Sequence, residues 1–396
     1  MVSLTRLVGG RAPEGEDLRY DPRAAEARRG ALPGRGPVVV WNWTRACNLA
    51  CVHCYASALR HPAPDELTTR EAHELLEELV ALRVPALLLS GGEPLARPDA
   101  LALIARARSR GLRLTLSTNG TLIDEPVADA LAAARVTYVG VSLDGPPEVH
   151  DAWRGRRGAH AETLEAIRRL VRRGVRVGIR FTLHRRSLAH VPYVLDLARR
   201  EGVHRVCFYH LVPAGRGARV ADQGLDRAEA RRVLAELLAY ALEAVERGDE
   251  TEILTVGNAS DGVFAYLWLR AHAPARAPRA LELLRRNGGN RSGVALLAID
   301  PSGHVHPDQF SWDVDLGSVR EHRLRDIWQG PATPPELEAL RDRRPRLEGR
   351  CARCAWLDLC HGNLRARARA AGAPWGPDPA CLLEDDEVLA LPGTGT

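Results

Sequence analysis

Short apolar runs alternate with amphipathic helical patterns between residue 38 and about residue 213. Six runs have the composition of strands, at 38–44, 86–91, 113–119, 137–145, 175–183 and 204–212. The stretches between them, such as 69–83, carry apolar residues at helical spacing. Six βα units in series predict an α/β fold with a parallel sheet and right-handed crossovers, and both a doubly wound sheet and a barrel fit this alternation.

Successive residues of a strand point to opposite faces of a sheet, which places the side chains of the predicted strands. In the fifth run, Val177 and Phe181 share the face that we expect to pack under the helices, whereas Arg180 lies on the face toward a polar interior. By the same parity, His210 is expected to point inward together with Phe208. Polar residues gather at the C-terminal ends of the strands, where parallel α/β folds place their active sites.

Beyond residue 225 the pattern becomes helical, with a Pro- and Ala-rich connector at 272–280 and a β-hairpin expected over 294–307. We therefore divide the chain into an N-terminal segment (1–37), a barrel (38–224), a helical connecting region (225–290) and a loop-rich C-terminal domain (291–396).

The composition is that of an ordinary globular protein. Apolar residues make up 45% and charged residues 27% of 396 positions, so a sizeable core is expected. No run approaches the roughly 18 apolar residues of a membrane span, and the N-terminus lacks the apolar core of a signal peptide. We therefore expect a cytoplasmic protein with reduced thiols and no membrane partner. A net charge of +5 is too small to indicate nucleic acid. All 55 basic residues are arginine, a bias typical of a GC-rich genome, although arginines also suit a polyacidic ligand.

Three of the eight cysteines stand close together directly after the first predicted strand, as Cys47-x3-Cys51-x2-Cys54. In a reduced compartment such a cluster indicates metal binding, with zinc and iron–sulfur as the two alternatives. Three thiolates on a four-iron cluster leave one iron with an open coordination position.

Further motifs follow the next strands in order: Ser90-Gly91-Gly92-Glu93-Pro94, then Asn119, then Ser142 and Asp144, then Arg180. With the cysteine triplet, this series resembles the radical S-adenosylmethionine (SAM) superfamily. The resemblance implies a partial (βα)6 TIM-like barrel, a [4Fe–4S] cluster and SAM. It also implies that Glu93 accepts a hydrogen bond from the SAM ammonium group and that Arg180 lies near the SAM carboxylate. The implied cofactor-binding residues are His53, Tyr55, Gly91, Gly92, Glu93, Asn119, Ser142, Asp144 and Arg180.

A second set of cysteines, Cys351-x2-Cys354-x5-Cys360-x20-Cys381, resembles the SPASM-type C-terminal extension. The resemblance implies a second [4Fe–4S] cluster, with all four cysteines as ligands. A zinc site that holds a loop-rich tail together is the alternative, because the same thiolates suit zinc. Cys207, within the sixth strand, is expected to be a small core residue.

Several smaller motifs together resemble the heme d1 biosynthesis radical SAM family (NirJ-type): 288–290, 292–294, 306–310, 214–217 and 360–363. The resemblance implies an iron tetrapyrrole substrate, 12,18-didecarboxysiroheme, from which propionate side chains are removed, and an electron donor such as flavodoxin or ferredoxin. Arg216 is the candidate for binding a substrate carboxylate, His210 and His306 for binding the substrate iron or a carboxylate, and Asp308 for donating a proton. Arg154, Arg156 and Arg157 also follow a strand end, and we expect most of them to be solvated.

Three alternatives remain at this point. Related heme-pathway enzymes remove acetates from the same tetrapyrrole or decarboxylate its propionates. A peptide-modifying maturase would share the barrel and the extension, although only about 37 residues precede the first strand here. A non-catalytic electron carrier would have no need of the SAM-binding motifs.

Overall fold

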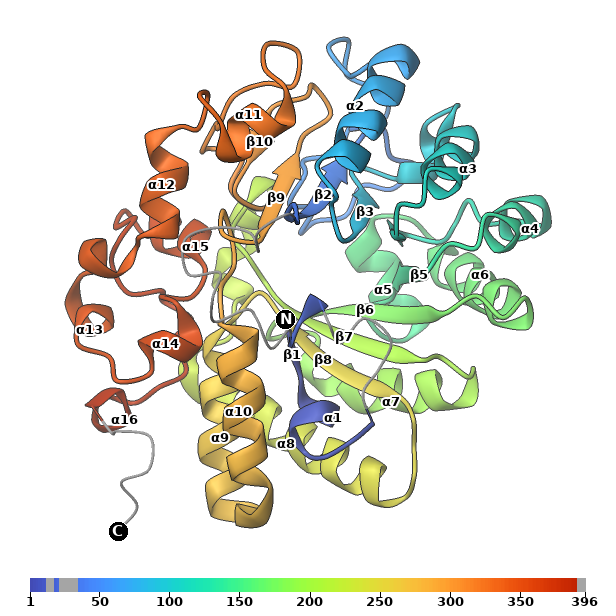
Figure 1. Cartoon of the computed structure of the whole chain (residues 1–396). Helices are drawn as coiled ribbons and strands as arrows, with labels where there is room; N and C mark the ends of the chain where they lie inside the picture. The colour runs from blue at the N-terminus through green and yellow to red at the C-terminus, as the bar shows by residue number, and fades with distance from the viewer. Residues whose placement is uncertain (12–17, 21–34, 390–396) are drawn as a thin grey trace.

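The computed structural model describes residues 1–11, 18–20 and 35–389. A curved ten-stranded sheet occupies the centre of this part of the chain, in the order β1-β8-β7-β6-β5-β4-β3-β2-β9-β10 (Figure 1). All neighbours from β8 to β9 pair in parallel, and the edge strands β1 and β10 pair antiparallel. The strands are β1 (Val2–Ser3), β2 (Val38–Asn42), β3 (Leu87–Ser90), β4 (Leu114–Thr118), β5 (Tyr138–Ser142), β6 (Val177–Leu183), β7 (Arg205–His210), β8 (Glu252–Val256), β9 (Leu296–Ile299) and β10 (Val305–His306).

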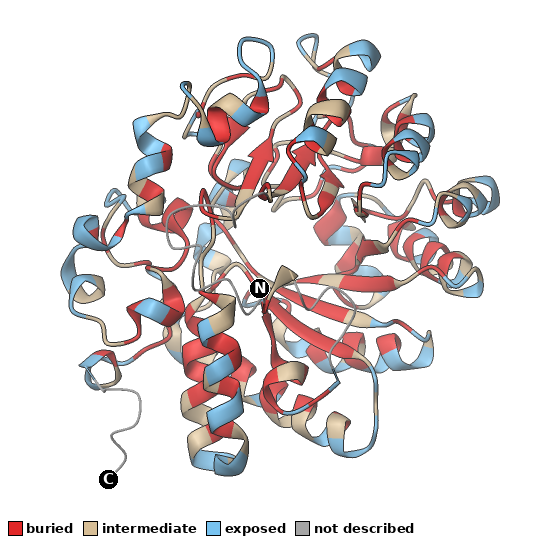
Figure 2. Ribbon diagram, in the orientation of Figure 1, coloured by how far each residue is buried: buried red, intermediate tan, exposed pale blue. Residues whose placement is uncertain are grey.

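The sheet curls into a barrel, and the barrel stays open because its two edge strands, β1 and β10, do not pair with each other. The six predicted strands are present as β2 to β7, so the prediction of a partial barrel is confirmed. Helices cover its outer face and turn their apolar sides toward the strands (Figure 2). The helices between the barrel strands are α2 (Thr69–Ala81), α3 (Ala100–Ser109), α4 (Glu125–Ala133), α5 (Pro147–Arg154), α6 (Ala159–Arg172) and α7 (Val191–Arg200).

The helix α2 illustrates how local sequence fixes these boundaries. Thr68 accepts a hydrogen bond from the Glu71 amide, and the Glu71 carboxylate accepts one from the Thr68 amide at 2.8 Å, which forms a capping box. Its apolar side, including Leu75 and Leu79, is buried in the shell between helices and sheet. Together with the apolar side of the other helices, this shell forms the main hydrophobic core.

The predicted strand parity holds for β6, where Val177 and Phe181 are buried in the outer shell and Arg180 lines the barrel interior. For β7 the prediction was wrong for Phe208, whereas His210 lines the interior pocket as expected. Phe208 packs edge-on against Phe181 in the outer shell, and Tyr209 faces the interior, where the Arg180 guanidinium lies 4.4 Å from its ring. The apolar ring of Phe208 is buried on the side of the strand that faces the helices. Cys207 therefore lies with Tyr209 on the inner face.

The segments outside the six βα units also build the sheet. Residues 225–290 contain the expected helices α8 (Arg227–Glu246), α9 (Ser260–His272) and α10 (Ala277–Asn287), but also the unpredicted strand β8. The N-terminal strand β1 pairs with β8, and α1 (Leu4–Leu7) follows it. The predicted hairpin is confirmed as β9 and β10, with the turn held by Asp300 Oδ1, which accepts hydrogen bonds from Ser302 and His304 amides.

Short helices and loops form the C-terminal part, beside α9 and α10 (Figure 1). The helices of this part are α11 (Leu324–Gln329), α12 (Pro335–Arg341), α13 (Gly349–Ala352), α14 (Leu357–Cys360), α15 (Arg365–Ala370) and α16 (Asp385–Leu389). In the described ranges, none of the helices is both long and apolar enough to cross a lipid bilayer.

Candidate active site at the C-terminal ends of the strands

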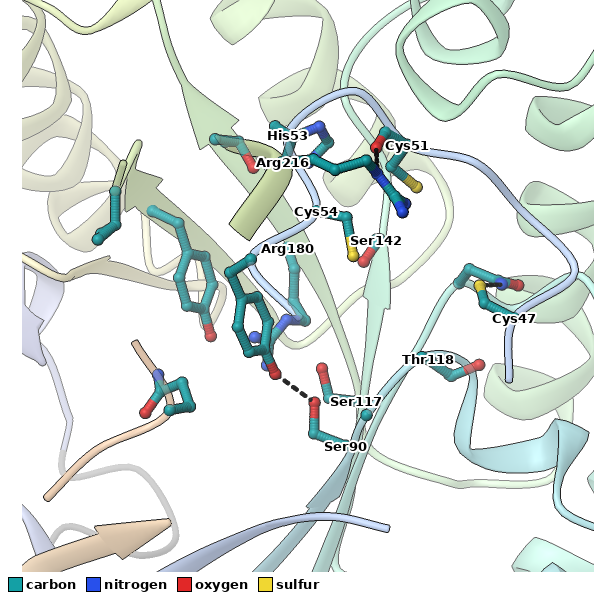
Figure 3. Close-up of a pocket in the computed structure, with 18 of the residues that line it drawn as sticks. Cys47, Cys51, His53, Cys54, Ser90, Ser117, Thr118, Ser142, Arg180 and Arg216 are labelled. Carbon is teal, nitrogen blue, oxygen red and sulfur yellow. Dashed lines mark hydrogen bonds between the residues drawn. The ribbon is translucent and has the colours of Figure 1, made fainter. Parts of the chain in front are cut away.

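The three clustered cysteines lie on the loop that follows β2, over the C-terminal ends of the strands. The loop is fixed by its backbone: the Cys47 amide donates to the Leu59 carbonyl, and the Leu59 amide donates to the Arg45 carbonyl, both at 2.7 Å. The thiols of Cys47, Cys51 and Cys54 line one pocket with about 1090 Å³ of open space, part of it continuous with solvent (Figure 3).

Burial dominates the electrostatics of these thiols. It raises the pKa of Cys47 to about 12, and it raises the pKa of Cys51, which the Arg154 guanidinium partly offsets. The Arg154 Nη1 donates to the Cys51 sulfur at 3.7 Å. Without metal the Cys47 thiol therefore keeps its proton, whereas a bound metal displaces the thiol proton and neutralises the thiolate charge.

The donor set of this loop fits an iron–sulfur cluster. Backbone and side-chain N–H groups already point at the sulfurs: the Leu49 amide lies 3.4 Å from Cys47 Sγ, and the Ala58 amide lies 3.5 Å from Cys54 Sγ. Such bonds stabilise charged sulfur ligands. In the described residues no three Cys, His, Asp or Glu side chains converge as a single metal ion requires.

Gly91 and Gly92 pack directly against this loop. The Gly92 amide donates to the Thr44 carbonyl and the Glu93 amide to the Ala46 carbonyl, both at 2.7 Å. A Cβ on Gly92 would lie 2.3 Å from the Ala46 oxygen, and Gly91 has a φ of 140°, which disfavours any side chain. The glycines line the pocket as predicted, and they also allow β3 to hold the cysteine loop.

Glu93 differs from its predicted role. Its side chain is fully buried and does not line the pocket. One carboxylate oxygen accepts from the Thr118 hydroxyl at 2.7 Å and the other from the Asn119 amide at 2.8 Å. The carboxylate therefore ties β3 to β4 through a hydroxyl and a backbone amide, and its predicted contact with the SAM ammonium group stays a prediction.

Asn119 and Ser142 line the pocket as predicted, and Asn119 Nδ2 lies 3.9 Å from the Cys47 sulfur. Asp144 is fully buried and does not line it, so the expected contact with SAM is not formed from this position. Its carboxylate instead pairs with Arg154 at 2.7 Å. Asp144, Arg154 and the Cys51 sulfur thus form one buried chain of interactions.

The sequence analysis missed the role of Arg154, which was expected to be solvated like its neighbours. Its side chain is 9% exposed, whereas Arg157 is exposed and Arg156 pairs with Glu162. The signal that could have identified it is the spacing of His150, Trp153 and Arg154 on α5, which turns these residues to one side of the helix.

His53 stacks on Trp153 with ring centroids 5.2 Å apart, and Trp153 stacks on His184 at 4.0 Å. Burial, followed by the charge of Arg154, lowers the pKa of His53 well below its ordinary value, so the ring is neutral. His53 lines the pocket, as predicted for an aromatic position near SAM. Tyr55 lines it too, and its hydroxyl donates to Asn42 Oδ1 at 2.7 Å.

Arg180 extends from β6 into the pocket below the cysteine loop (Figure 3). Its guanidinium lies over Tyr209, and it forms no hydrogen bond or ion pair with the described residues. A guanidinium inside the pocket without an anionic partner suits a carboxylate ligand, as the predicted position near the SAM carboxylate requires.

The four residues proposed to act on substrate are not gathered in one place. Arg216 lines the pocket but uses Nε and Nη1 to bind the Cys51 and Ala58 carbonyls, at 2.9 and 2.7 Å. It therefore holds the cysteine loop, and the predicted carboxylate contact is left to Nη2, which has no partner in the described residues. His210 lines the pocket edge, and its Nε2 lies 2.9 Å from Asp261 on α9.

His306 lies outside the pocket, which corrects its predicted role. It is buried, its Nδ1 binds the Val314 carbonyl at 2.8 Å, and its ring stacks on Trp312. Asp308 is also buried. Its Oδ1 accepts from the Phe310 amide and the Ser311 hydroxyl, while Oδ2 is buried with no hydrogen-bond partner among the described residues. Asp308 lines a neighbouring cavity.

The second set of cysteines lies around α13 and α14, and α14 packs against α9 and α10. Burial raises the pKa of Cys360 well above its ordinary value, and Cys381, Cys351 and Cys354 raise it further because their thiols are near. The Asn290 amide donates to the Cys360 carbonyl at 3.1 Å, which fixes this loop to the end of α10. The Cys360 thiol thus lies near the other three, and their binding of one shared cluster stays a prediction.

Comparisons with known proteins agree with this geometry. The radical SAM superfamily matches residues 41–198, and the SPASM iron–sulfur cluster-binding domain matches residues 292–355. Fe-coproporphyrin III synthase of Methanosarcina barkeri is 40% identical over 98% of this chain and 99% of its own length. Pre-heme d1 synthase of Dinoroseobacter shibae is 43% identical over 96% of this chain and 93% of its own.

Among solved structures, Streptococcus suis SuiB bound to precursor peptide SuiA superposes with a TM-score of 0.69 over 88% of this chain and 76% of its own; at 17% identity it shows the fold alone. The radical SAM domain implies a [4Fe–4S] cluster and SAM as cofactors, and the SPASM domain implies additional iron–sulfur clusters. Cys47, Cys51 and Cys54 are the residues that would hold the first cluster. The chain is thus a radical SAM enzyme that belongs to the SPASM-containing members of the superfamily and is closely related to radical SAM enzymes of heme biosynthesis.

Proposed function

We propose that this enzyme removes propionate side chains from 12,18-didecarboxysiroheme, an iron tetrapyrrole, in the biosynthesis of heme d1. The observation that carries the proposal is the 43% identity to pre-heme d1 synthase over 96% of the chain. When bound, the cluster and SAM supply a carbon-centred radical that abstracts a hydrogen atom from the substrate.

The protein's own residues support this reaction by positioning the cysteine loop and the substrate. The cysteine loop is clamped from one side by the two glycines after β3 and from the other by Arg216. Arg180 offers a guanidinium to a carboxylate of SAM or of the substrate. Asp308, whose Oδ2 is buried without a hydrogen-bond partner among the described residues, stays the candidate proton donor.

A mass measurement tests the proposal. The anaerobically reconstituted enzyme is incubated with 12,18-didecarboxysiroheme, SAM and dithionite, and the product is analysed by mass spectrometry. We expect loss of propionate mass together with release of 5′-deoxyadenosine. A variant with Cys47, Cys51 and Cys54 replaced by alanine is the control and should release none. Absence of any tetrapyrrole product from the wild type refutes the proposal.

A second candidate is favoured by the 40% identity to Fe-coproporphyrin III synthase over 98% of the chain. That reaction would remove acetate side chains from the same tetrapyrrole. The same incubation separates the two candidates, because loss of acetate instead of propionate assigns the enzyme to the second.

A further inference from the structure

A second cavity opens from the barrel interior through the gap between the two edges of the sheet. It has about 1590 Å³ of open space, including the part continuous with solvent. It shares Arg180, Tyr209, Gln309 and Phe310 with the cysteine pocket, so the two spaces meet at these side chains. Much of its wall is apolar, formed by Val38, Val40, Leu88, Val256, Phe310 and Leu364.

The charges on this wall are strongly biased. Among the described residues, the arginine, aspartate and glutamate side chains that line the cavity are five arginines and one aspartate: Arg19, Arg35, Arg180, Arg286, Arg291 and Asp308. Arg19 pairs with Glu252, and Arg286 pairs with Glu282, so their charges are already balanced.

Arg291 and Arg180 are different. Arg291 is half-buried in the loop between α10 and β9, and no carboxylate or carbonyl of the described residues binds its guanidinium. Burial alone lowers its pKa, and no neighbouring acid opposes this effect. Arg180 likewise lacks a hydrogen-bond or ion-pair partner there. A guanidinium withdrawn from water without an anion is unfavourable, which indicates that both groups are arranged to bind an anionic ligand.

We infer that this cavity binds a polycarboxylate macrocycle, with the ring against the apolar wall and separate carboxylates on Arg291 and Arg180. This inference rests on the proposed function, because it names the residues that hold the proposed substrate. A flat ring with carboxylates at its edge matches an apolar wall with guanidinium groups at its margin. Arg180 lines both the cavity and the pocket of the cysteine loop. A carboxylate side chain of the macrocycle that binds Arg180 would therefore reach that pocket.

Binding by Arg291 is tested by optical titration of the reconstituted enzyme with 12,18-didecarboxysiroheme. Loss of one charge-assisted interaction predicts that Arg291→Gln weakens binding roughly 10- to 100-fold. Arg291→Lys should recover part of the affinity, because the charge is kept and the fork is lost. The matched control is Arg285→Gln, an exposed arginine of α10 outside the cavity, which should bind as the wild type does.

Further readouts separate binding from folding. The thermal unfolding midpoint and the affinity for SAM should be the same in Arg291→Gln and wild type, because Arg291 does not line the cysteine pocket. The methyl ester of the tetrapyrrole, which keeps the ring and loses the charges, should bind both proteins equally.

Equal affinity of wild type and Arg291→Gln for the free acid overturns the inference and leaves the proposed function standing. If the wild type does not bind 12,18-didecarboxysiroheme at all, the proposed function fails. Coproporphyrin III, another carboxylated macrocycle, then tests the cavity with the same variants: binding that depends on Arg291 supports the inference, and absence of such binding overturns it as well.

Discussion

The buried pair of Asp144 and Arg154 allows a sharp test of how the cysteine loop is supported. Asp144 is fully buried, and Arg154 is 9% exposed, with 2.7 Å between their charged atoms. Asp144→Asn keeps the shape of the side chain but leaves the guanidinium without a counter-ion. Removing one member of a buried pair costs about 3–5 kcal/mol, a large part of the roughly 5–15 kcal/mol that stabilises a typical domain.

We expect the free energy of unfolding, measured by urea titration under anaerobic conditions, to fall by about that amount in Asp144→Asn. Glu148→Gln, an exposed acid on the same helix α5, is the matched control and should change stability by less than about 0.5 kcal/mol. The double variant Asp144→Asn/Arg154→Gln removes both charges, so it should be less destabilised than the sum of the single variants.

The same variants report on the cluster, because Arg154 donates to the Cys51 sulfur. Loss of this N–H and its positive charge in Arg154→Gln should lower the reduction potential of the N-terminal cluster. The proposed energetic coupling between Asp144 and Arg154 is refuted if the two substitutions have additive effects on stability. It is also refuted if Asp144→Asn is as stable as the wild type.

Three further predictions follow from the same structure. Gly92→Ala should prevent assembly of the N-terminal cluster, because the added methyl group would lie 2.3 Å from the Ala46 carbonyl; iron content measures this. Glu71 has its pKa lowered from 4.5 to about 2, first by its hydrogen bond with Arg320, so the stability it contributes is present above about pH 4.5 and is lost as the pH falls toward 2. Urea unfolding between about pH 5 and pH 3 should therefore show a smaller loss of stability in Glu71→Gln than in wild type. Wild-type protein purified anaerobically should contain about eight irons per chain, and Cys351→Ala should contain about four. Zinc bound by the C-terminal cysteines, with only about four irons in the wild type, would contradict the second cluster.

The sequence predicted the barrel well because each of its strands is a short run rich in apolar and β-branched residues between amphipathic helices. Strand β8 was missed because its five residues lie between two strongly helical stretches, although Ile253, Thr255 and Val256 carry the β-branched signal of a strand. The error for Phe208 has a similar origin: parity gives two faces, and the choice between them depends on packing against Phe181, which the sequence does not contain.

The candidate site was predictable where function requires a fixed spacing, as for the cysteines and the paired glycines. It was not predictable where a polar group finds its partner through the fold. Glu93 accepts hydrogen bonds from Thr118 and Asn119, Asp144 pairs with Arg154 of α5, and His306 Nδ1 binds a loop carbonyl. Only the three-dimensional arrangement shows which polar side chains are left facing the pocket.

Strand β9 lies beyond the domain boundary predicted at residue 291 yet pairs along β2, from Val38 with Leu296 to Trp41 with Ile299. The strand that leads into the cysteine loop is therefore an interior strand only because this later segment of the chain covers it. A protein truncated before residue 291 would turn β2 into an exposed edge, with unpaired amides and carbonyls that invite association with other chains. Barrel-only truncations of this enzyme should aggregate, and the domain boundary seen in the sequence should not be used as a cleavage point for separating the two cluster sites.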